Sequence, residues 1–223
     1  MAHSVVIPSK TMDNLLPCMA AVRKHEPAAK IVVIDDGLPF DLINCWSRDG
    51  GGPDIAQLGI KPFIFSRNMN LGIKAAGDDD VILLNDDALL KTPGGFSALK
   101  KLADDESDFG IFAPCTNVTG APAQRFQGVG LREVDNVAFV CVYIPRRTIN
   151  AVGLLDERFV TYGWDDNDYC RRVKMAGLKI GVYDFTFVDH GSLRSTFRGD
   201  PGAAGNIEEG RRIFNEKWGV GAA

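Results

Sequence analysis

Apolar runs that end directly in carboxylates are the feature of this sequence that most constrains its fold. Val81-Ile82-Leu83-Leu84 is typical of a fully buried strand, and Asn85-Asp86-Asp87 follows at once. Ile31-Val32-Val33-Ile34, followed by Asp35-Asp36-Gly37, repeats this arrangement. In an open α/β sheet, ligands bind outside the carboxyl ends of the strands. Such carboxylates are well placed to hold a metal or a ribose; the alternative is that each is a polar loop after a strand.

Strands alternate with helices over about the first 90 residues, which predicts the fold class. This order is typical of an α/β protein with a single doubly wound, mostly parallel sheet flanked by helices. Asn14 is the expected cap of the first helix. Strands are expected at residues 5–7, 31–34, 62–65, 81–84, 110–113, 137–144, 180–182 and 185–188, and helices at about 14–25, 70–76, 96–103, 146–152, 165–176 and 207–218.

The composition argues against several functional classes. With 223 residues, 45% of them hydrophobic and 24% charged, the chain suits one large globular domain or two small ones. Its net charge of −4 argues against nucleic-acid binding, which usually shows a basic face. No apolar run approaches the roughly 18 residues of a transmembrane helix, and the N-terminus lacks a signal-peptide pattern. The five scattered cysteines suit a reducing cytosol, so we expect a cytoplasmic protein.

A third carboxylate cluster, Asp165, Asp166 and Asp168, begins a predicted helix beside Tyr162 and Trp164. Acidic residues at the start of a helix commonly cap it and complement its dipole. Three acids are more than one cap needs, and the neighbouring aromatic rings suggest a pocket with stacking surfaces. A carboxylate there could serve as a general base, which must lie within hydrogen-bond reach of the proton it removes.

His190 follows the last predicted strand and has two interpretations. It is either a polar residue at a strand end or a metal ligand shared with Asp87. A neutral imidazole is a common ligand, and Mg²⁺ or Mn²⁺ commonly bridges carboxylates to substrate phosphates. Asp189 is then either a partner that orients the imidazole or a turn residue.

Several common motifs are absent from the sequence. It has no P-loop lysine signature and no Gly-X-Ser-X-Gly elbow. No Gly-X-Gly-X-X-Gly follows the first strand, which argues against a dinucleotide-binding oxidoreductase. A nucleotidyltransferase, a second class with a similar layout, would need a Gly-rich basic loop there, and Pro8-Ser9-Lys10 does not supply one.

Short motifs occur in a characteristic order along the chain. They are Val5-Val6-Ile7-Pro8-Ser9, residues 31–37, Asn70-Leu71-Gly72-Ile73, residues 83–87, Leu155-Asp156-Glu157-Arg158-Phe159, residues 162–172, Gly177, His190 and Lys217-Trp218-Gly219. Together, over most of the chain, they resemble the family-2 glycosyltransferases, inverting enzymes of the GT-A fold. The Trp164-Asp165-Asp166 form is especially similar to the rhamnosyl- and galactofuranosyltransferase branches.

The resemblance implies roles at the donor site. Pro8 and Ser9 would lie near the nucleotide base, and Asp35 or Asp36 would contact the base or the ribose. Asn85 stands where the Asp-X-Asp motif has its first acid, so any ribose contact would be a hydrogen bond without charge assistance. Further residues expected to bind the nucleotide sugar are Asn70, Asp86 and Trp164.

The resemblance also implies the metal site and the base. Asp87 with His190 would coordinate Mn²⁺ or Mg²⁺ on the donor diphosphate. Asp166 would deprotonate the acceptor hydroxyl, and Asp165 could help to position the acceptor. The donor would be a UDP-, dTDP- or GDP-linked hexose or deoxyhexose, and the acceptor a glycan or another hydroxyl compound. A nucleotide-sugar-binding module without transferase activity stays open because of Asn85.

Residues 1–223 are expected to form a single GT-A domain. Residues 1–90 would make the nucleotide-sugar-binding half, and residues 91–223 the acceptor and catalytic half. The chain lacks the Gln-X-X-Arg-Trp motif and the membrane helices of processive synthases, so it resembles a soluble enzyme. Acceptor specificity is expected to depend on the loops at 114–130 or 192–205, or on a second subunit in a possible homodimer.

Overall fold

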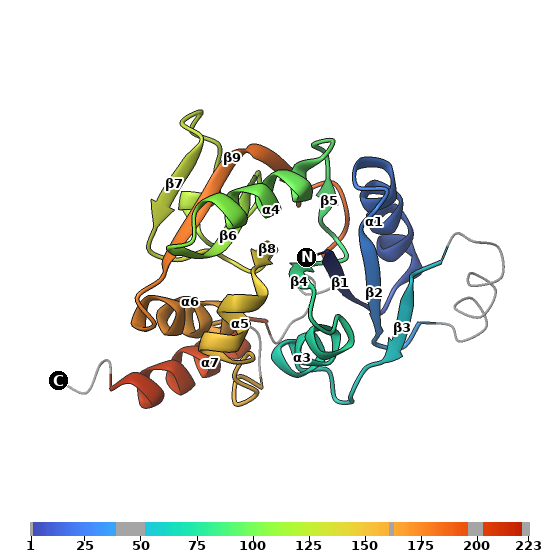
Figure 1. The fold of residues 1–223 in the computed structure, drawn as a ribbon. Helices are drawn as coiled ribbons and strands as arrows, with labels where there is room; N and C mark the ends of the chain where they lie inside the picture. The colour runs from blue at the N-terminus through green and yellow to red at the C-terminus, as the bar shows by residue number, and fades with distance from the viewer. Residues whose placement is uncertain (1, 39–51, 161–162, 196–202, 220–223) are drawn as a thin grey trace.

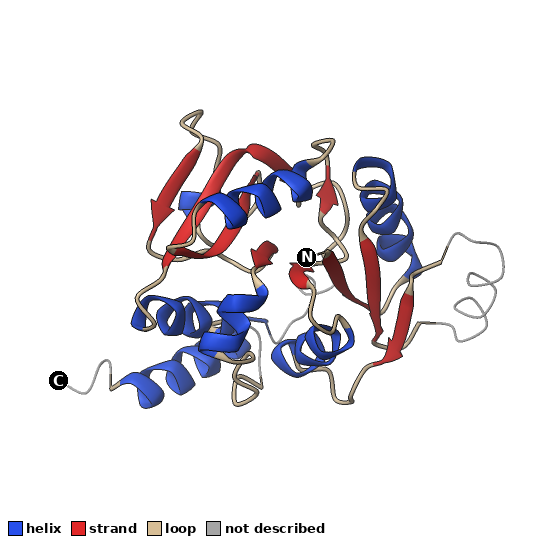
Figure 2. Cartoon of the chain, viewed as in Figure 1, coloured by secondary structure: helices blue, strands red, loops and turns tan. Residues whose placement is uncertain are grey.

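The computed structural model describes residues 2–38, 52–160, 163–195 and 203–219 (Figure 1). Within these ranges, nine strands form one sheet in the order β3-β2-β1-β4-β8-β6-β9-β5, and β7 pairs with β9. Figure 2 shows helices on both sides of it. The strands are β1 (His3–Ser9), β2 (Lys30–Asp35), β3 (Ile55–Leu58), β4 (Asp80–Leu84), β5 (Leu89–Leu90), β6 (Phe109–Thr116), β7 (Leu131–Val134), β8 (Cys141–Ile144) and β9 (Lys179–Asp189). The predicted α/β fold class is confirmed.

The half of the sheet built from the first part of the chain is parallel. β1 lies between β2 and β4, and Val5 pairs with Ile31 on one side and with Ile82 on the other. β3 adds a further parallel strand at the edge. β8 then runs antiparallel to β4 and to β6, while β9 runs parallel to β6. The carboxyl ends of β1, β2 and β4 therefore meet at one edge of the sheet, where ligands bind in such folds.

Helices cover both faces because the central strands are apolar on both. Val5 and Ile7 contribute to one core cluster with α1 (Met12–His25) and α4 (Gly95–Asp105). Val6, which points to the opposite face, belongs to a second cluster with α3 (Phe65–Ala75), α5 (Arg146–Val152) and α6 (Asp165–Met175). The last helix, α7 (Ala203–Trp218), lies alongside α6, as Figure 1 shows.

Several local predictions were wrong. The strand expected at residues 137–144 is confined to β8, and the helix expected at residues 70–76 is the later part of α3. Residues 62–65 do not form a strand, and Phe65 already begins α3. The strand that pairs with the outer side of β2 is β3, a half-exposed edge strand without a continuous apolar run. Asn14 does not cap α1, which begins at Met12, and its side chain donates instead to the carbonyl of Arg194 at 3.0 Å. Residues 180–182 and 185–188 belong to one long strand, β9, which pairs with β6 and β7.

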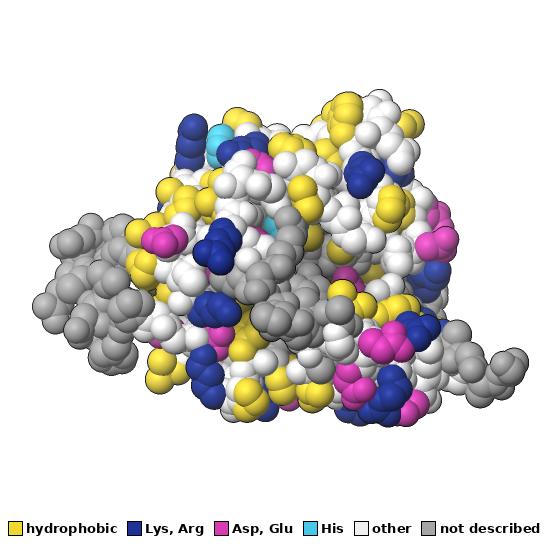
Figure 3. Space-filling model, turned by 180° about the vertical axis from the view of Figure 1, so that it is seen from behind, with side chains coloured by type: hydrophobic (Ala, Val, Ile, Leu, Met, Phe, Trp, Pro, Cys, Tyr) yellow, Lys and Arg dark blue, Asp and Glu magenta, His cyan; other side chains and the backbone are white. Residues whose placement is uncertain are grey.

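The surface and the helices agree with the composition. On the face seen in Figure 3, basic, acidic and apolar side chains are interspersed. Among the described helices, none has both the length and the apolar character needed to cross a lipid bilayer.

Candidate active site

A cavity of about 810 Å³ opens at the carboxyl ends of β1, β2 and β4. Its walls also include the end of β9, the start of α6 and the start of α7. Ten of the residues that the sequence pointed to line it: Pro8, Ser9, Asp36, Asn85, Asp86, Asp87, Trp164, Asp165, Asp166 and His190. Segments more than 100 residues apart in the sequence thus meet at one site.

Asp86 and Ser9 join the ends of β4 and β1. The Ser9 hydroxyl donates a hydrogen bond of 2.6 Å to Oδ2 of Asp86. Burial raises the pKa of Asp86 to about 6, the Ser9 hydrogen bond opposes this rise, and the neighbouring charge of Asp87 adds to it. Asp86 thus links the ends of the two strands through one carboxylate oxygen, and it also lines the cavity.

Asp87 and His190 are in direct contact, and both line the cavity. Oδ1 of Asp87 lies 3.1 Å from Nε2 of His190, and both side chains are 8% exposed. The other ring nitrogen, Nδ1, lies 2.7 Å from the carbonyl oxygen of Val118. Because a carbonyl can only accept, Nδ1 must carry the hydrogen, and in a neutral ring Nε2 then presents a lone pair to the carboxylate. The contact is favourable only with a proton or a cation between the two atoms.

This donor set fits a divalent cation. Mg²⁺–oxygen distances are about 2.0–2.1 Å, so adjacent ligands of one ion lie on the order of 3 Å apart, as Asp87 and His190 do. The described residues contain no group of three or more His, Cys, Asp or Glu side chains arranged to hold a metal. A cation here would complete its shell with water and substrate oxygens, as Mg²⁺ commonly does.

The backbone of His190 is also held in place. Oδ1 of Asn117 accepts a hydrogen bond of 2.8 Å from the His190 N–H, and Nδ2 of Asn117 donates to Asp189 at 2.8 Å. Ser192 donates to the same Asp189 carboxylate, and these contacts hold its pKa at about 2. Asp189 thus orders the turn that carries His190.

The second carboxylate pair, Asp165 and Asp166, begins α6 on the other side of the cavity. The turn before it is tight: Gly163 and Trp164 both have positive φ, 88° and 72°. Asp165 is buried, and its Oδ2 accepts no hydrogen bond from the described residues. Burial, and then the charge of Asp166, raise the pKa of Asp165 to about 8.

Asp166 has a different environment from its neighbour. It is partly exposed to the cavity, and its Oδ1 accepts hydrogen bonds from the backbone N (2.8 Å) and Nδ2 (3.1 Å) of Asn167. Burial raises the pKa of Asp166, while these donors and the N–H of Phe139 lower it. Burial thus raises the pKa of both carboxyls, and the donors around Asp166 stabilise its negative charge when it is ionised.

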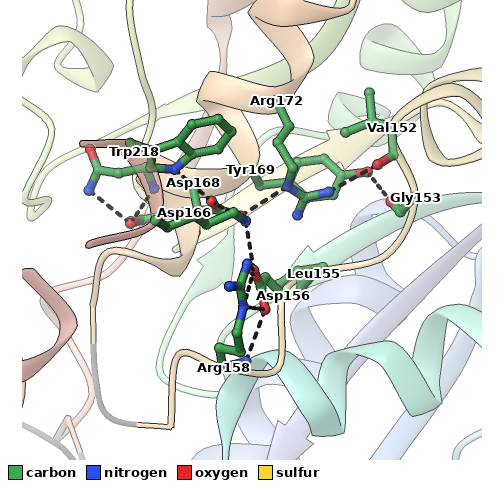
Figure 4. A network of polar contacts seen from close by, with 12 residues as sticks. Val152, Gly153, Leu155, Asp156, Arg158, Asp166, Asp168, Tyr169, Arg172 and Trp218 are labelled. Carbon is green, nitrogen blue, oxygen red and sulfur yellow. Dashed lines mark hydrogen bonds and ion pairs between the residues drawn. The ribbon is translucent and has the colours of Figure 1, made fainter. Parts of the chain in front are cut away.

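A buried network fixes α6 beneath these carboxylates (Figure 4). Asp168, fully buried, accepts hydrogen bonds from Nε of Arg172 and Nε1 of Trp218, both at 2.9 Å. Nζ of Lys217 lies 2.6 Å from Asp168 and 2.6 Å from Asp156. The end of α7 is thus bound to α6 and to Asp156, in the segment that precedes α6 in the sequence.

The beginning of α7 contributes to the cavity wall. Ile207 lines the cavity, and Phe214 lies with its ring centroid 5.1 Å from that of Trp164. Gly210 faces the Gly163–Trp164 turn so closely that a Cβ atom there would lie 2.6 Å from the Gly163 carbonyl oxygen. α7 therefore supports the turn that presents Asp165 and Asp166.

Two of the expected binding residues lie outside the cavity wall. Oδ1 of Asp35 accepts hydrogen bonds from the N–H groups of Gly37 and Leu38, so this carboxylate shapes the loop and Asp36 is the one that lines the cavity. Asn70 is buried within α3, and its amide bonds the backbone of Leu155 in both directions, at 2.9 and 3.0 Å. The prediction assumed that a helix starts at residue 70, whereas α3 starts five residues earlier.

Other residues near the site were not singled out as binding or catalytic residues from the sequence. Lys61 contacts both the carboxylate and the carbonyl oxygen of Asp36, and Phe63 and Phe65 add apolar wall beside it. Asn136 and Asn167 bring amide groups to the region of Asp166. These residues are ordinary loop and helix types, and only the folded chain brings them to the cavity. Tyr162 lies outside the described residues.

The sequence comparisons give no match: no protein-family model and no curated protein is significantly similar to this chain. Solved structures with a similar fold do exist. One is GalNAc-T7 with UDP, GalNAc and Mn²⁺, at a TM-score of 0.78 and 14% identity, covering 97% of this chain and 48% of that one. Another is residues 1–349 of S. aureus TarS in complex with UDP-GlcNAc, at a TM-score of 0.69 and 12% identity, covering 100% and 68%.

The similarity runs through the whole of this chain, although the chain spans only about half the length of GalNAc-T7. At these low identities the similarity is one of fold. The chain therefore has the GT-A fold, which it shares with these glycosyltransferase structures.

Proposed function

We propose that this chain is a glycosyltransferase that moves a sugar from a nucleotide-diphosphate sugar to an acceptor hydroxyl with inversion at the anomeric carbon. The observation that carries the proposal is the joint presence, in one cavity of a GT-A fold, of the Asp87–His190 pair and the Asp165–Asp166 pair. The first suits a cation on a diphosphate and the second suits proton removal, the two needs of this reaction.

The donor would bind across the ends of β1, β2 and β4. Asp36, with Lys61 beside it, and Ser9 offer polar contacts for a base or a ribose, and Phe63 offers an apolar surface. UDP-linked sugars are the first donors to test, because the structures of similar fold contain UDP or UDP-GlcNAc. dTDP- and GDP-sugars follow, since the Trp164-Asp165-Asp166 form resembles the rhamnosyl- and galactofuranosyltransferases.

Asp87 and His190 would hold Mn²⁺ or Mg²⁺, which stabilises the negative charge of a departing nucleoside diphosphate. Contacts within the chain orient His190 before a cation arrives. The Val118 carbonyl keeps the hydrogen of His190 on Nδ1, and Asn117 fixes its backbone. Nε2 is therefore the ring nitrogen that would bind the cation.

Asp166 would take the proton of the acceptor hydroxyl. Its hydrogen-bond donors favour the charged form, so it can accept a proton, while Asp165 beside it favours the neutral form and can donate a hydrogen bond to the acceptor. One base, one in-line displacement and no enzyme nucleophile give inversion. The transferred group would be a hexose or a deoxyhexose, and residues 1–223 would act as one domain.

Thermal unfolding with nucleotide and metal tests the donor and metal sites together. UDP, dTDP or GDP with Mn²⁺ or Mg²⁺ should raise the unfolding temperature of the wild type by about 5–10 °C at 100 times the Kd. His190→Ala should lose the metal-dependent part of this rise. His25→Ala, at the end of α1, is the matched control and should keep it.

Two results would count against this part of the proposal. If no nucleotide stabilises the protein, the cavity is not a nucleotide site. If His190→Ala keeps the full metal-dependent shift, His190 is not a ligand. Nucleotide binding without turnover of any donor sugar would instead favour an inactive binding module, in which Asn85 has replaced a needed acid.

A further inference from the structure

A series of amide groups lies beside Asp166. Both hydrogen bonds that Asn167 donates to Asp166, from its backbone N and from Nδ2, end on the same oxygen, Oδ1. Oδ1 of Asn167 in turn accepts a hydrogen bond of 3.0 Å from Nδ2 of Asn136, in the loop between β7 and β8. All three residues line the cavity.

This arrangement fixes how the Asn167 amide is oriented. An ionised carboxylate can only accept, so the NH₂ group of Asn167 must face Asp166. Its carbonyl then faces the other way, where the NH₂ group of Asn136 satisfies it. Rotation of the Asn167 side chain would break the bonds at both ends. The amide is therefore held between a helix and a loop, in the geometry that donates to Asp166.

We propose that Asn167 is a positioning residue for the base: it holds Oδ1 of Asp166 and thereby fixes the orientation in which the carboxylate meets the acceptor. This inference rests on the proposed function, in which Asp166 is that base. The acceptor hydroxyl would thus meet a carboxylate whose orientation is set before the acceptor arrives.

The same contacts matter for the charge of Asp166, which has several charged neighbours. Asp165 and Asp168 lie on α6 itself. The charged or titratable side chains that line the cavity from other elements are Lys10, Asp36, Asp86, Asp87 and His190. Burial raises the pKa of Asp166, and the N–H groups of Asn167 and Phe139 oppose that rise. Loss of the Asn167 amide should therefore raise the pKa further.

The test is an NMR titration of the ¹³C-labelled aspartate carboxyl groups in the full chain, without nucleotide or acceptor. Asp166→Asn assigns the Asp166 resonance. Asn167→Ala should raise the pKa of Asp166 by about one pH unit, a tenfold change, because one hydrogen bond to a charged group is lost. Asn167→Asp should raise it more, because a like charge replaces the donor.

Asn167→Asp separates positioning from folding. The new side chain has almost the same shape, and an acid in the first turn of a helix is favourable for the helix. The unfolding temperature of the Asn167→Asp variant should therefore stay near that of the wild type. Met175→Ala, at the other end of α6 where Met175 is 68% exposed, is the matched control and should leave the pKa of Asp166 unchanged.

An unchanged pKa of Asp166 in both Asn167 variants would overturn the proposal. The titration needs no turnover, so it is decided separately from the proposed function. Once a donor is turned over, Asn167→Asp should lower kcat about tenfold or more, leave the KM for the donor unchanged, and move the acidic limb of the pH–kcat profile to higher pH. A loss confined to KM would contradict a positioning role.

Discussion

At the scale of single residues, the site depends on neighbouring carboxyls whose surroundings differ. Asp165 is buried with an oxygen that accepts no hydrogen bond from the described residues, whereas Asp166 accepts two from Asn167. The same chemical group thus has an oxygen without a donor at one position and an oxygen with two donors at the next. Burial raises the pKa of the Asp165 carboxyl, so this group costs more stability as the pH rises.

Asp165→Asn should therefore stabilise the protein at high pH. The folded-state pKa of Asp165, about 8, lies above the unfolded value near 4, so the folded state binds the proton more tightly. The contribution of this group is full below about pH 4 and is lost as the pH rises through about 8. Denaturant unfolding should show a gain of about 1–3 kcal/mol for the variant at pH 8 that shrinks towards pH 4.

The control for this comparison is Asp78→Asn, in an exposed turn, which should show no such pH-dependent difference from the wild type. If the Asp165→Asn gain is the same at pH 5 and pH 8, or if the variant is destabilised at pH 8, then Asp165 does not hold a proton in the folded state.

At the scale of elements, α7 completes the site. Its end is bound to α6 through the contacts of Lys217 and Trp218 with Asp168, and its middle contacts the Gly163–Trp164 turn through Gly210. A helix that comes late in the sequence thus holds the start of α6, where the proposed base lies. The close contact at Gly210 is where this arrangement is most sensitive to an added atom.

Gly210→Ala and Gly205→Ala form a matched pair on α7. At Gly210 a Cβ atom would lie 2.6 Å from the Gly163 carbonyl oxygen, so the helix or the turn must shift, at a cost of about 1–3 kcal/mol. At Gly205 a Cβ meets nothing within 4 Å, and alanine should be neutral or stabilising by up to about 1 kcal/mol. Chemical denaturation of both variants measures the difference; equal stability would show that α7 does not press on this turn.

At the scale of the whole molecule, the sequence predicted the parallel half of the sheet well. The runs at 5–7, 31–34 and 81–84 are buried on both faces, so their apolar residues are continuous and identify them as strands. β3 is a half-exposed edge strand without such a run, and the apolar residues 62–65 that resembled a strand instead precede and begin α3.

The site could be predicted only where strand ends or family motifs marked it. Asp86 and Asp87 follow a buried strand. The resemblance to a known family predicted that Asp166 and His190 belong to the same site. Nothing local in the sequence separates Asn70, which is buried against Leu155, from a residue of the cavity. Contacts such as those of Asn167 with Asn136, 31 residues apart, depend on the packing of α6 against the loop before β8, which no local pattern encodes.

The most direct test of the central claim is the release of nucleoside diphosphate from UDP-, dTDP- and GDP-sugars, with Mn²⁺ or Mg²⁺, by the wild type and by Asp166→Asn. The account predicts that the wild type releases nucleotide from at least one donor. Asp166→Asn should lose about 10²–10⁴-fold in this rate, while it binds the nucleotide as tightly as the wild type. Equal turnover by Asp166→Asn, or no turnover by the wild type with any donor, would contradict it.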